Sequence, residues 1–426
     1  MAPLGYKGKN VFHGEMVTLF LSVLVGLLIP PIVLTLPIVV KWYFDLVSSL
    51  SDLIPYYLWV PIPLAIGGLI TGLIIRKAAP EAEGPGLHIA AAAYHRNDSM
   101  LRARTPITKY IATIFTVGSG GTNSIVSPSA LIGYSLGSSL ARRLGSNKER
   151  IRTLSLCGLA AAIAALFETP LGAAIFAVEV AFSNRILYKR FFFCLASSIP
   201  AYLISHMLVV KSPMLDFPRG TEVYTLEALL ILAFVAVSVV VFSVIYVKFY
   251  QFLHDTFDRL RWDRWGWLKP VIGMGVAGII MIFAYPTLID RGYAGGYSGE
   301  TFPLEDFNSL SLMLAVIVLF FTTSLIASSG GSGGLFMPVF AMGGITGLLI
   351  SSLITDISPS IFAVAGISAA LATTLNVPLA SAIICMELFG PPAFIPAVIG
   401  SIFGYLVGKR YVIYQEIRWT RLKNHQ

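Results

Sequence analysis

The sequence predicts an all-α polytopic membrane protein built from two related halves, and three observations support this prediction. Of the 426 residues, 56% are hydrophobic and only 12% are charged, whereas an ordinary soluble domain carries about 25% charged residues. The mean hydropathy is +0.78. Apolar stretches recur along the whole chain, and two similar glycine-rich runs interrupt them.

Several apolar stretches are candidates for membrane helices, which need about 20 mostly apolar residues to cross a bilayer. They cover residues 16–40, 58–75, 154–178, 191–210, 226–247, 271–284, 310–326 and 361–386. We expect no cleavable signal peptide, because the first stretch continues too far. The three cysteines lie in apolar runs and are expected to be buried hydrophobic residues without a disulfide or metal role: Cys157, Cys194 and Cys385.

The net charge of +8 is concentrated in a few segments. Basic clusters occur at residues 96–104, 142–152, 248–269 and 409–423, whereas segments 216–227 and 291–306 each hold one Arg against three acids. Basic loops mark the cytoplasmic side of a membrane protein. The sequence therefore predicts a multi-pass protein of the cell membrane with a cytoplasmic C-terminus. A nucleic-acid partner is not expected.

Two pairs of similar segments indicate an internal duplication. The run "SGGTNSIVSP" at 119–128 aligns with "SGGSGGLFMP" at 329–338 at an offset of 210. A second pair, "GLAAAIAALFETPLGAAIFAVE" and "GISAALATTLNVPLASAIICME", ends at Glu179 and Glu387 with the same Gly, Pro and Glu spacing. Such repeats in membrane transporters commonly have inverted topology. We place the halves at 1–212 and 213–426, and expect no cytoplasmic regulatory domain.

The glycine-rich runs predict helices that begin inside the membrane. Irregular backbone at membrane depth survives only where protein encloses it, and a glycine bend followed by proline favours a new helix start. The free N–H groups at such a start can bind an anion. A third break, "APEAEGPGLH" at 79–88, offers another start. Neither of the two repeated runs contains Lys or Arg, so we expect backbone charges alone to hold the ion. The alternative is that the glycines only let helices pack closely.

At this point the sequence resembles the CLC family of chloride channels and proton-coupled anion exchangers. The family's Gly-Ser-Gly-Ile-Pro loop corresponds to "GPGLH" at 84–88, its Gly-Arg-Glu-Gly-Pro loop to "SIVSP" at 124–128, and its Gly-x-Phe-x-Pro loop to "GLFMP" at 334–338. The resemblance implies a homodimer with one anion pathway per subunit. It also implies a central anion site at Pro85, Gly86, Leu335, Phe336 and Tyr414, and an outer site at Ile125, Val126 and Ser127.

Two departures from the family pattern concern proton coupling. Val126 stands where the family has its gating glutamate, and Val180 stands where exchangers tend to have an internal proton-transfer glutamate. Valine can neither ionise nor carry a proton. The resemblance therefore implies a divergent member that lacks the gating glutamate and conducts anions passively. Glu179 and Glu387 remain, and their symmetric spacing favours a structural role at helix ends over proton transfer.

Three further positions have two interpretations each. Pro85 replaces the serine of chloride-selective members and offers neither a hydroxyl nor an N–H, which favours weaker chloride discrimination; alternatively it is a helix N1 residue. Tyr414 resembles the family's anion-binding tyrosine, although a belt aromatic at the membrane boundary is the other interpretation. His88 is either a helix-start residue near solvent or a pH sensor.

The sequence favours a passive transporter over other classes of protein. It offers no metal-ligand spacing, no carboxylate pair and no nucleotide-binding signature, so we expect no enzyme, no metal and no cofactor. The expected partners are chloride or another small monovalent anion, membrane lipid and a second copy of the chain. The function predicted is uncoupled anion transport by a channel or uniporter. Alternatives are an exchanger using non-standard proton groups, and a non-conducting sensor or scaffold.

Overall fold

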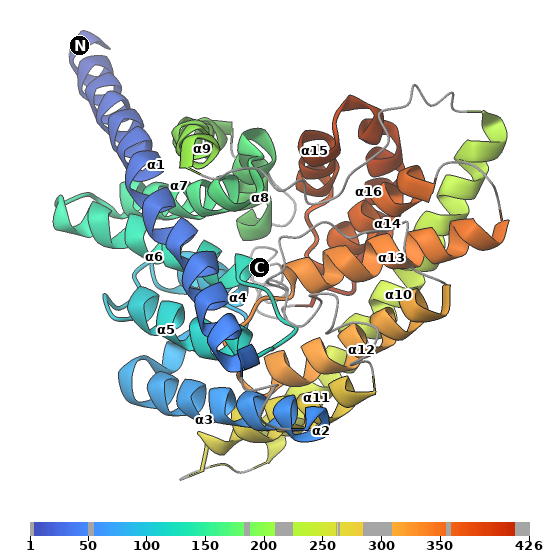
Figure 1. The fold of residues 1–426 in the computed structure, drawn as a ribbon. Helices are drawn as coiled ribbons and strands as arrows, with labels where there is room; N and C mark the ends of the chain where they lie inside the picture. The colour runs from blue at the N-terminus through green and yellow to red at the C-terminus, as the bar shows by residue number, and fades with distance from the viewer. Residues whose placement is uncertain are drawn as a thin grey trace.

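The computed structural model describes residues 4–49, 55–182, 188–208, 225–260, 262, 265–283, 309–354 and 359–413. Within these ranges the regular elements are helices (Figure 1). The chain first forms α1 (Leu4–Ser48), α2 (Tyr56–Trp59), α3 (Pro61–Ala78), the 3-10 turn η2 (Pro80–Ala82), α4 (Leu87–Arg96), α5 (Thr105–Gly118), α6 (Val126–Arg143), α7 (Lys148–Phe167), α8 (Pro170–Phe182) and α9 (Tyr188–Leu208). It continues with α10 (Leu226–Arg259), α11 (Leu268–Ile282), α12 (Ser309–Ser328), α13 (Phe336–Ile354), α14 (Pro359–Thr374), α15 (Pro378–Phe389), η5 (Pro391–Ala393) and α16 (Phe394–Gly408).

Eight helices in the described part are long and apolar enough to span a bilayer. Their outer faces carry exposed apolar side chains such as Phe20, Ile38 and Trp42 on α1, which suit a hydrocarbon surrounding. The all-α membrane fold predicted from composition is confirmed. The predicted boundary between residues 212 and 213 lies outside the described residues and stays a prediction. Tyr414 and most of the two acidic segments also lie outside the described residues.

Helices that the repeat makes equivalent lie on opposite sides of the molecule. In Figure 1 the teal and green helices α5 to α9 lie on the left, and the orange and red helices α12 to α16 lie on the right. The early helix α3 packs against α11 of the later part below them. The pairs α6–α7 and α13–α14 are both among the most extensive contacts of the fold.

Glycines bring these equivalent helix pairs together in the same way. A Cβ added to Gly133 of α6 would lie 2.3 Å from the Gly158 carbonyl oxygen of α7, and one added to Gly158 would lie 2.1 Å from the Gly133 oxygen. In the second part, Gly343 and Gly366 show the same reciprocal approach at 2.6 and 2.2 Å. Close packing is therefore the role of these four glycines, and it supports the proposed duplication.

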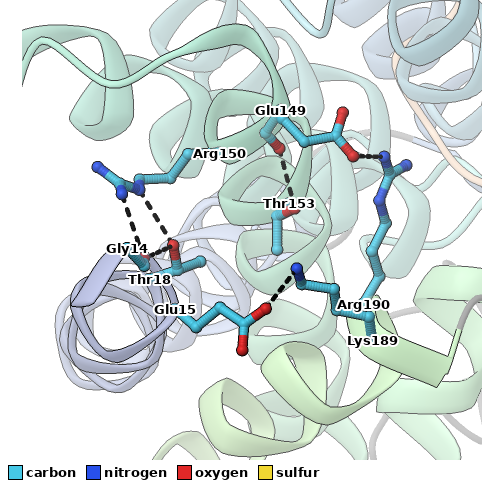
Figure 2. A network of polar contacts seen from close by, with 8 residues as sticks. All are labelled: Gly14, Glu15, Thr18, Glu149, Arg150, Thr153, Lys189 and Arg190. Carbon is cyan, nitrogen blue, oxygen red and sulfur yellow. Dashed lines mark hydrogen bonds and ion pairs between the residues drawn. The ribbon is translucent and has the colours of Figure 1, made fainter. Parts of the chain in front are cut away.

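Figure 2 shows how polar side chains fix the beginning of α1 against α7 and α9. The Arg150 guanidinium donates to the Thr18 hydroxyl at 3.0 Å and to the Gly14 carbonyl at 3.2 Å. The same network contains two ion pairs, Lys189–Glu15 at 2.6 Å and Arg190–Glu149 at 2.5 Å. α1, the first membrane-length helix, is thereby held at one end by charges from two later helices.

The two repeated glutamates cap each other's helices. Glu179, at the end of α8, accepts hydrogen bonds from the amides of Leu379 and Ala380 at 3.1 and 2.8 Å, at the start of α15. Glu387, at the end of α15, accepts from the second and third residues of α8 at 3.0 and 2.7 Å. Each helix starts with Pro, which has no N–H, so the carboxylates take the next two amides. This geometry supports the structural role expected of both glutamates.

We expect Glu179→Ala to lower the free energy of unfolding by about 2–4 kcal/mol, because two buried amides would lose charge-assisted partners. The loss would be measured as a lower melting temperature of the detergent-solubilised protein. Glu387→Ala should cost less because Glu387 is only half-buried. The matched control is Glu227→Ala, which removes an exposed acid from the start of α10. Equal melting temperatures for Glu179→Ala and the control would contradict the capping role.

Candidate anion site

The two glycine-rich runs meet in space and end at two helix starts. Ser124 and Gly334 form an isolated antiparallel β-bridge with N–H···O distances of 2.9 and 2.6 Å. α6 begins two residues after Ser124 and α13 two residues after Gly334. Gly120 and Gly330, equivalent by the 210-residue offset, both have left-handed backbone with φ of +100° and +92°, which glycine adopts readily. The predicted broken helices are therefore present in the structure.

The third predicted break brings α4 to the same place. Gly86 is the N-cap of α4 with φ +111°, and a Cβ added there would lie 3.1 Å from the Ser127 carbonyl oxygen. The first amides of α4, α6 and α13 have no earlier carbonyl within their own helices, so three partly positive helix ends converge here. Pro85 precedes this N-cap. The interpretation of Pro85 as helix residue N1 is therefore wrong.

The predicted outer residues do not all offer a free donor. The Val126 amide donates to the Ser124 hydroxyl at 3.1 Å, and its role as an anion donor stays a prediction. Ser127 differs, because its hydroxyl oxygen is fully buried and has no hydrogen-bond partner in the described structure. Gly334 packs directly against it, since an added Cβ would lie 2.5 Å from that oxygen. A buried hydroxyl without a partner is costly unless a ligand satisfies it.

Leu335 and Phe336 lie at the start of α13, and their side chains form an apolar surface beside it. Both side chains are fully buried. The Phe336 ring lies 5.1 Å from the ring of Phe167 and 5.6 Å from that of Phe176, measured between centroids. The intrahelical bond from the Val339 amide to the Leu335 carbonyl starts the helix and leaves the preceding amides available. Low polarity around these amides strengthens their interaction with a negative ion.

Lys109 of α5 is a functional candidate that the sequence analysis missed. Its side chain is fully buried, and its ammonium donates to the Ala82 carbonyl at 3.1 Å and to the Gly84 carbonyl. A Cβ added to Gly86 would lie 3.3 Å from the Lys109 Cε atom. A buried lysine amino group therefore lies beside the start of α4, a group that the expectation of backbone charges alone did not include. A lone ionisable residue in a membrane segment is itself a signal of function.

A cavity reaches this site from one side of the molecule. It has a volume of about 380 Å³, and its lining includes Gly84, Pro85, His88, Tyr250 and Ile413. The Ile413 amide donates to the Thr374 carbonyl at 2.9 Å, which fixes the chain where it enters the cavity wall. Tyr414, the next residue, lies outside the described residues, and its anion-binding role stays a prediction.

Val180 does not belong to this cluster. It is buried near the end of α8, where the neighbouring Ala181 carbonyl lies 2.6 Å from the His95 ring nitrogen at the far end of α4. The 10 residues of α4 span about 15 Å at 1.5 Å per residue. Val180, where the resemblance implies a lost proton group, is therefore separated from the Gly86 end by about the length of this helix.

Comparisons with known proteins agree with this geometry. The model of the family described as voltage gated chloride channel matches residues 67–409. An uncharacterized protein of Methanocaldococcus jannaschii is 28% identical over 365 residues, which cover 85% of this chain and 88% of that protein. An H(+)/Cl(−) exchange transporter of Vibrio cholerae is 24% identical over 464 aligned positions, covering 99% of this chain and 92% of the transporter.

Two solved structures show the same fold. The structure of a slow cyanobacterial Cl−/H+ antiporter has a TM-score of 0.80 and 20% identity, covering 96% of this chain and 99% of that one. The structure of a CLC-type fluoride/proton antiporter has a TM-score of 0.79 and 19% identity, covering 94% and 97%. The arrangement of helices is thus shared over nearly the entire chain.

Proposed function

The chain belongs to the voltage gated chloride channel family, and from this premise we propose that it carries small monovalent anions such as chloride or nitrate passively across the cell membrane. The ion would bind at the starts of α4 and α13, near Pro85, Gly86, Leu335 and Phe336, with Tyr414 completing the site. A second position would lie at the start of α6. The transporter would act as a homodimer with a cytoplasmic C-terminus.

One observation carries this proposal: three helix starts converge beside a buried lysine and a buried hydroxyl without a hydrogen-bond partner. Lys109 and the unpaired Ser127 hydroxyl are both fully buried, and both favour an anion nearby. The two positions at which the resemblance places proton-binding carboxylates are occupied by Val126 and Val180, which cannot ionise. A pathway without these groups has no evident means to couple anion movement to a proton.

A proton-coupled exchanger is the second candidate. The Vibrio cholerae relative and both solved structures are named as exchangers or antiporters. An exchanger would need titratable groups elsewhere along the pathway. The two candidates differ in one measurable property, because an exchanger moves anions uphill when a pH difference is imposed and a passive pathway does not.

We expect the purified protein in liposomes to release chloride and nitrate down their gradients. Because Pro85 offers no hydroxyl or N–H, the rate for nitrate should equal or exceed the rate for chloride. A pH difference of about 2 units, equivalent to about 2.7 kcal/mol per proton, should not drive uphill anion movement. Anion-selective electrodes and a pH dye would record both fluxes.

Each possible result of that measurement has a distinct meaning. Uphill chloride movement with opposite proton movement would establish the exchanger and overturn the passive proposal. Protein-dependent flux without uphill movement supports the proposal. Liposomes whose folded protein releases neither anion would point to the sensor or scaffold and remove transport altogether.

A further inference from the structure

Two adjoining cavities lead to the start of α4, and both have polar walls. Their volumes are about 470 and 380 Å³, and they share four lining residues: Glu83, Asp258, Lys269 and Gly330. The smaller cavity also contains Gly84 and Pro85. If the proposed function holds, an anion that enters here passes these residues before it reaches the helix starts. The charges of this entrance therefore bear directly on transport.

Glu83 lies next to both of the loops that lead to the site. It directly precedes Gly84, and its carboxylate faces Gly330, the first glycine after Ser329 in the second glycine-rich run. A Cβ added to Gly330 would lie 2.6 Å from the Glu83 Oε1 atom and 3.1 Å from its carboxyl carbon. The carboxylate thus lies between the loop that starts α4 and the loop that leads to α13.

Glu83 is also an acid whose carboxylate makes no direct polar contact in the described structure. Within the described residues its carboxylate has no hydrogen bond and no ion pair. Asp258, which shares the cavity, is held differently, because Lys269 lies 3.5 Å from one oxygen and His254 lies 3.6 Å from the other. Lys109 donates its hydrogen bonds to loop carbonyls. An ionised Glu83 would therefore place a negative charge where an anion must pass, and the nearby Lys269 acts on it without forming a direct ion pair.

The other charged and titratable groups around this carboxylate come from five helices. They are Arg76 of α3, His88 of α4, Lys109 of α5, and His254, Asp255 and Asp258 of α10, with Lys269 at the start of α11. Loss of contact with water raises the pKa of the Glu83 carboxyl; the charge of Lys269 opposes this rise and that of Asp258 adds to it. The neutral form is thus populated at a higher pH than for an ordinary glutamate.

We propose that Glu83 is a proton-binding gate residue at this entrance. In its ionised form the carboxylate repels an anion approaching the start of α4, and in its protonated form it lets the anion pass. Protons then regulate the passive pathway without being transported through it. Because the neutral form gains population as the pH falls, flux increases on acidification.

The test compares chloride release from liposomes at equal internal and external pH, between about pH 8 and about pH 5, because a raised glutamate pKa shifts the change of charge toward neutral pH. The wild type should release chloride roughly tenfold faster at the acid end, as expected when about 1.4 kcal/mol of repulsion is removed. Glu83→Gln should be fast at every pH, and Glu83→Asp should keep the pH dependence.

Glu81→Gln is the matched control. Glu81 lies two residues earlier, and its carboxylate is already occupied by the Thr105 hydroxyl at 2.9 Å and by Arg102 at 3.8 Å. This variant should keep the wild-type pH profile. Melting temperatures in detergent would show that each variant is folded.

The outcomes separate this inference from the proposed function. If Glu83→Gln conducts but keeps the wild-type pH dependence, the gate is another group, such as His88 or His254, and the inference is overturned while passive transport stands. If the wild type conducts equally at every pH, the inference fails in the same way. If folded wild type and Glu83→Gln both carry no anion, the proposed function fails and the gate fails with it.

Discussion

Replacing Val126 with glutamate should slow anion flux roughly tenfold near neutral pH and restore it on acidification. A carboxylate at the start of α6 would compete with the anion for the partial positive charge of the helix, an interaction worth about 1–2 kcal/mol, or about tenfold in occupancy. Protonation would remove the competitor. Chloride release from liposomes as a function of pH measures the effect.

The Val126→Glu experiment needs a background and a control. The background is Glu83→Gln, which should itself show little pH dependence and so separates the two carboxylates. The control is Val126→Gln. Glutamine has nearly the same shape as glutamate but does not ionise, so this variant should conduct equally at every pH. A Val126→Glu protein whose pH profile matches that of Val126→Gln would show that this position lies outside the pathway.

Lys109→Met is the second change with a large expected effect. A unit charge about 8 Å from an anion contributes about 2 kcal/mol at an effective dielectric of about 20, so chloride affinity should fall at least roughly tenfold. The Ala82 and Gly84 carbonyls would also lose their donor, at a cost of about 1–3 kcal/mol of folding free energy. Isothermal titration with chloride and thermal melting measure the two effects.

Two variants serve as references for Lys109→Met. Lys77→Met removes an exposed cation from the last turn of α3 and should leave both affinity and melting temperature near wild type. Lys109→Arg keeps the charge and should retain more affinity than Lys109→Met even if it packs poorly. Unchanged chloride affinity together with a lower melting temperature would make Lys109 a structural residue only.

The sequence was informative wherever a local pattern decides the structure. The spacing of Gly and Pro in the two repeated runs predicted helix starts at Val126 and Phe336 within a residue or two, because a glycine bend followed by proline has few alternatives. The hydrophobic composition likewise predicted the class of fold. The symmetric placement of Glu179 and Glu387 was sufficient to favour a structural role, although it did not identify their partners.

The details that escaped prediction depend on contacts between distant segments. Lys109 reaches carbonyls 25 and 27 residues earlier, and no local pattern indicates which loop a buried lysine will meet. The amide of Val126 finds its acceptor in the hydroxyl of Ser124, in a loop that is held by a bridge to Gly334, 210 residues later. Pro85 falls one position before the cap because Gly86, not Pro85, takes the left-handed conformation.

The reciprocal capping of α8 and α15, in which a glutamate at the end of each helix accepts from the first amides of the other, bears on the origin of the chain. The capping is symmetric, so two separate copies of one half-length ancestor could have supplied both caps to each other. Each copy would have depended on its mate to finish a helix, and joining the genes would have made that mate permanently present. In the present chain, loss of either acid would leave two amides of the other helix without their acceptor.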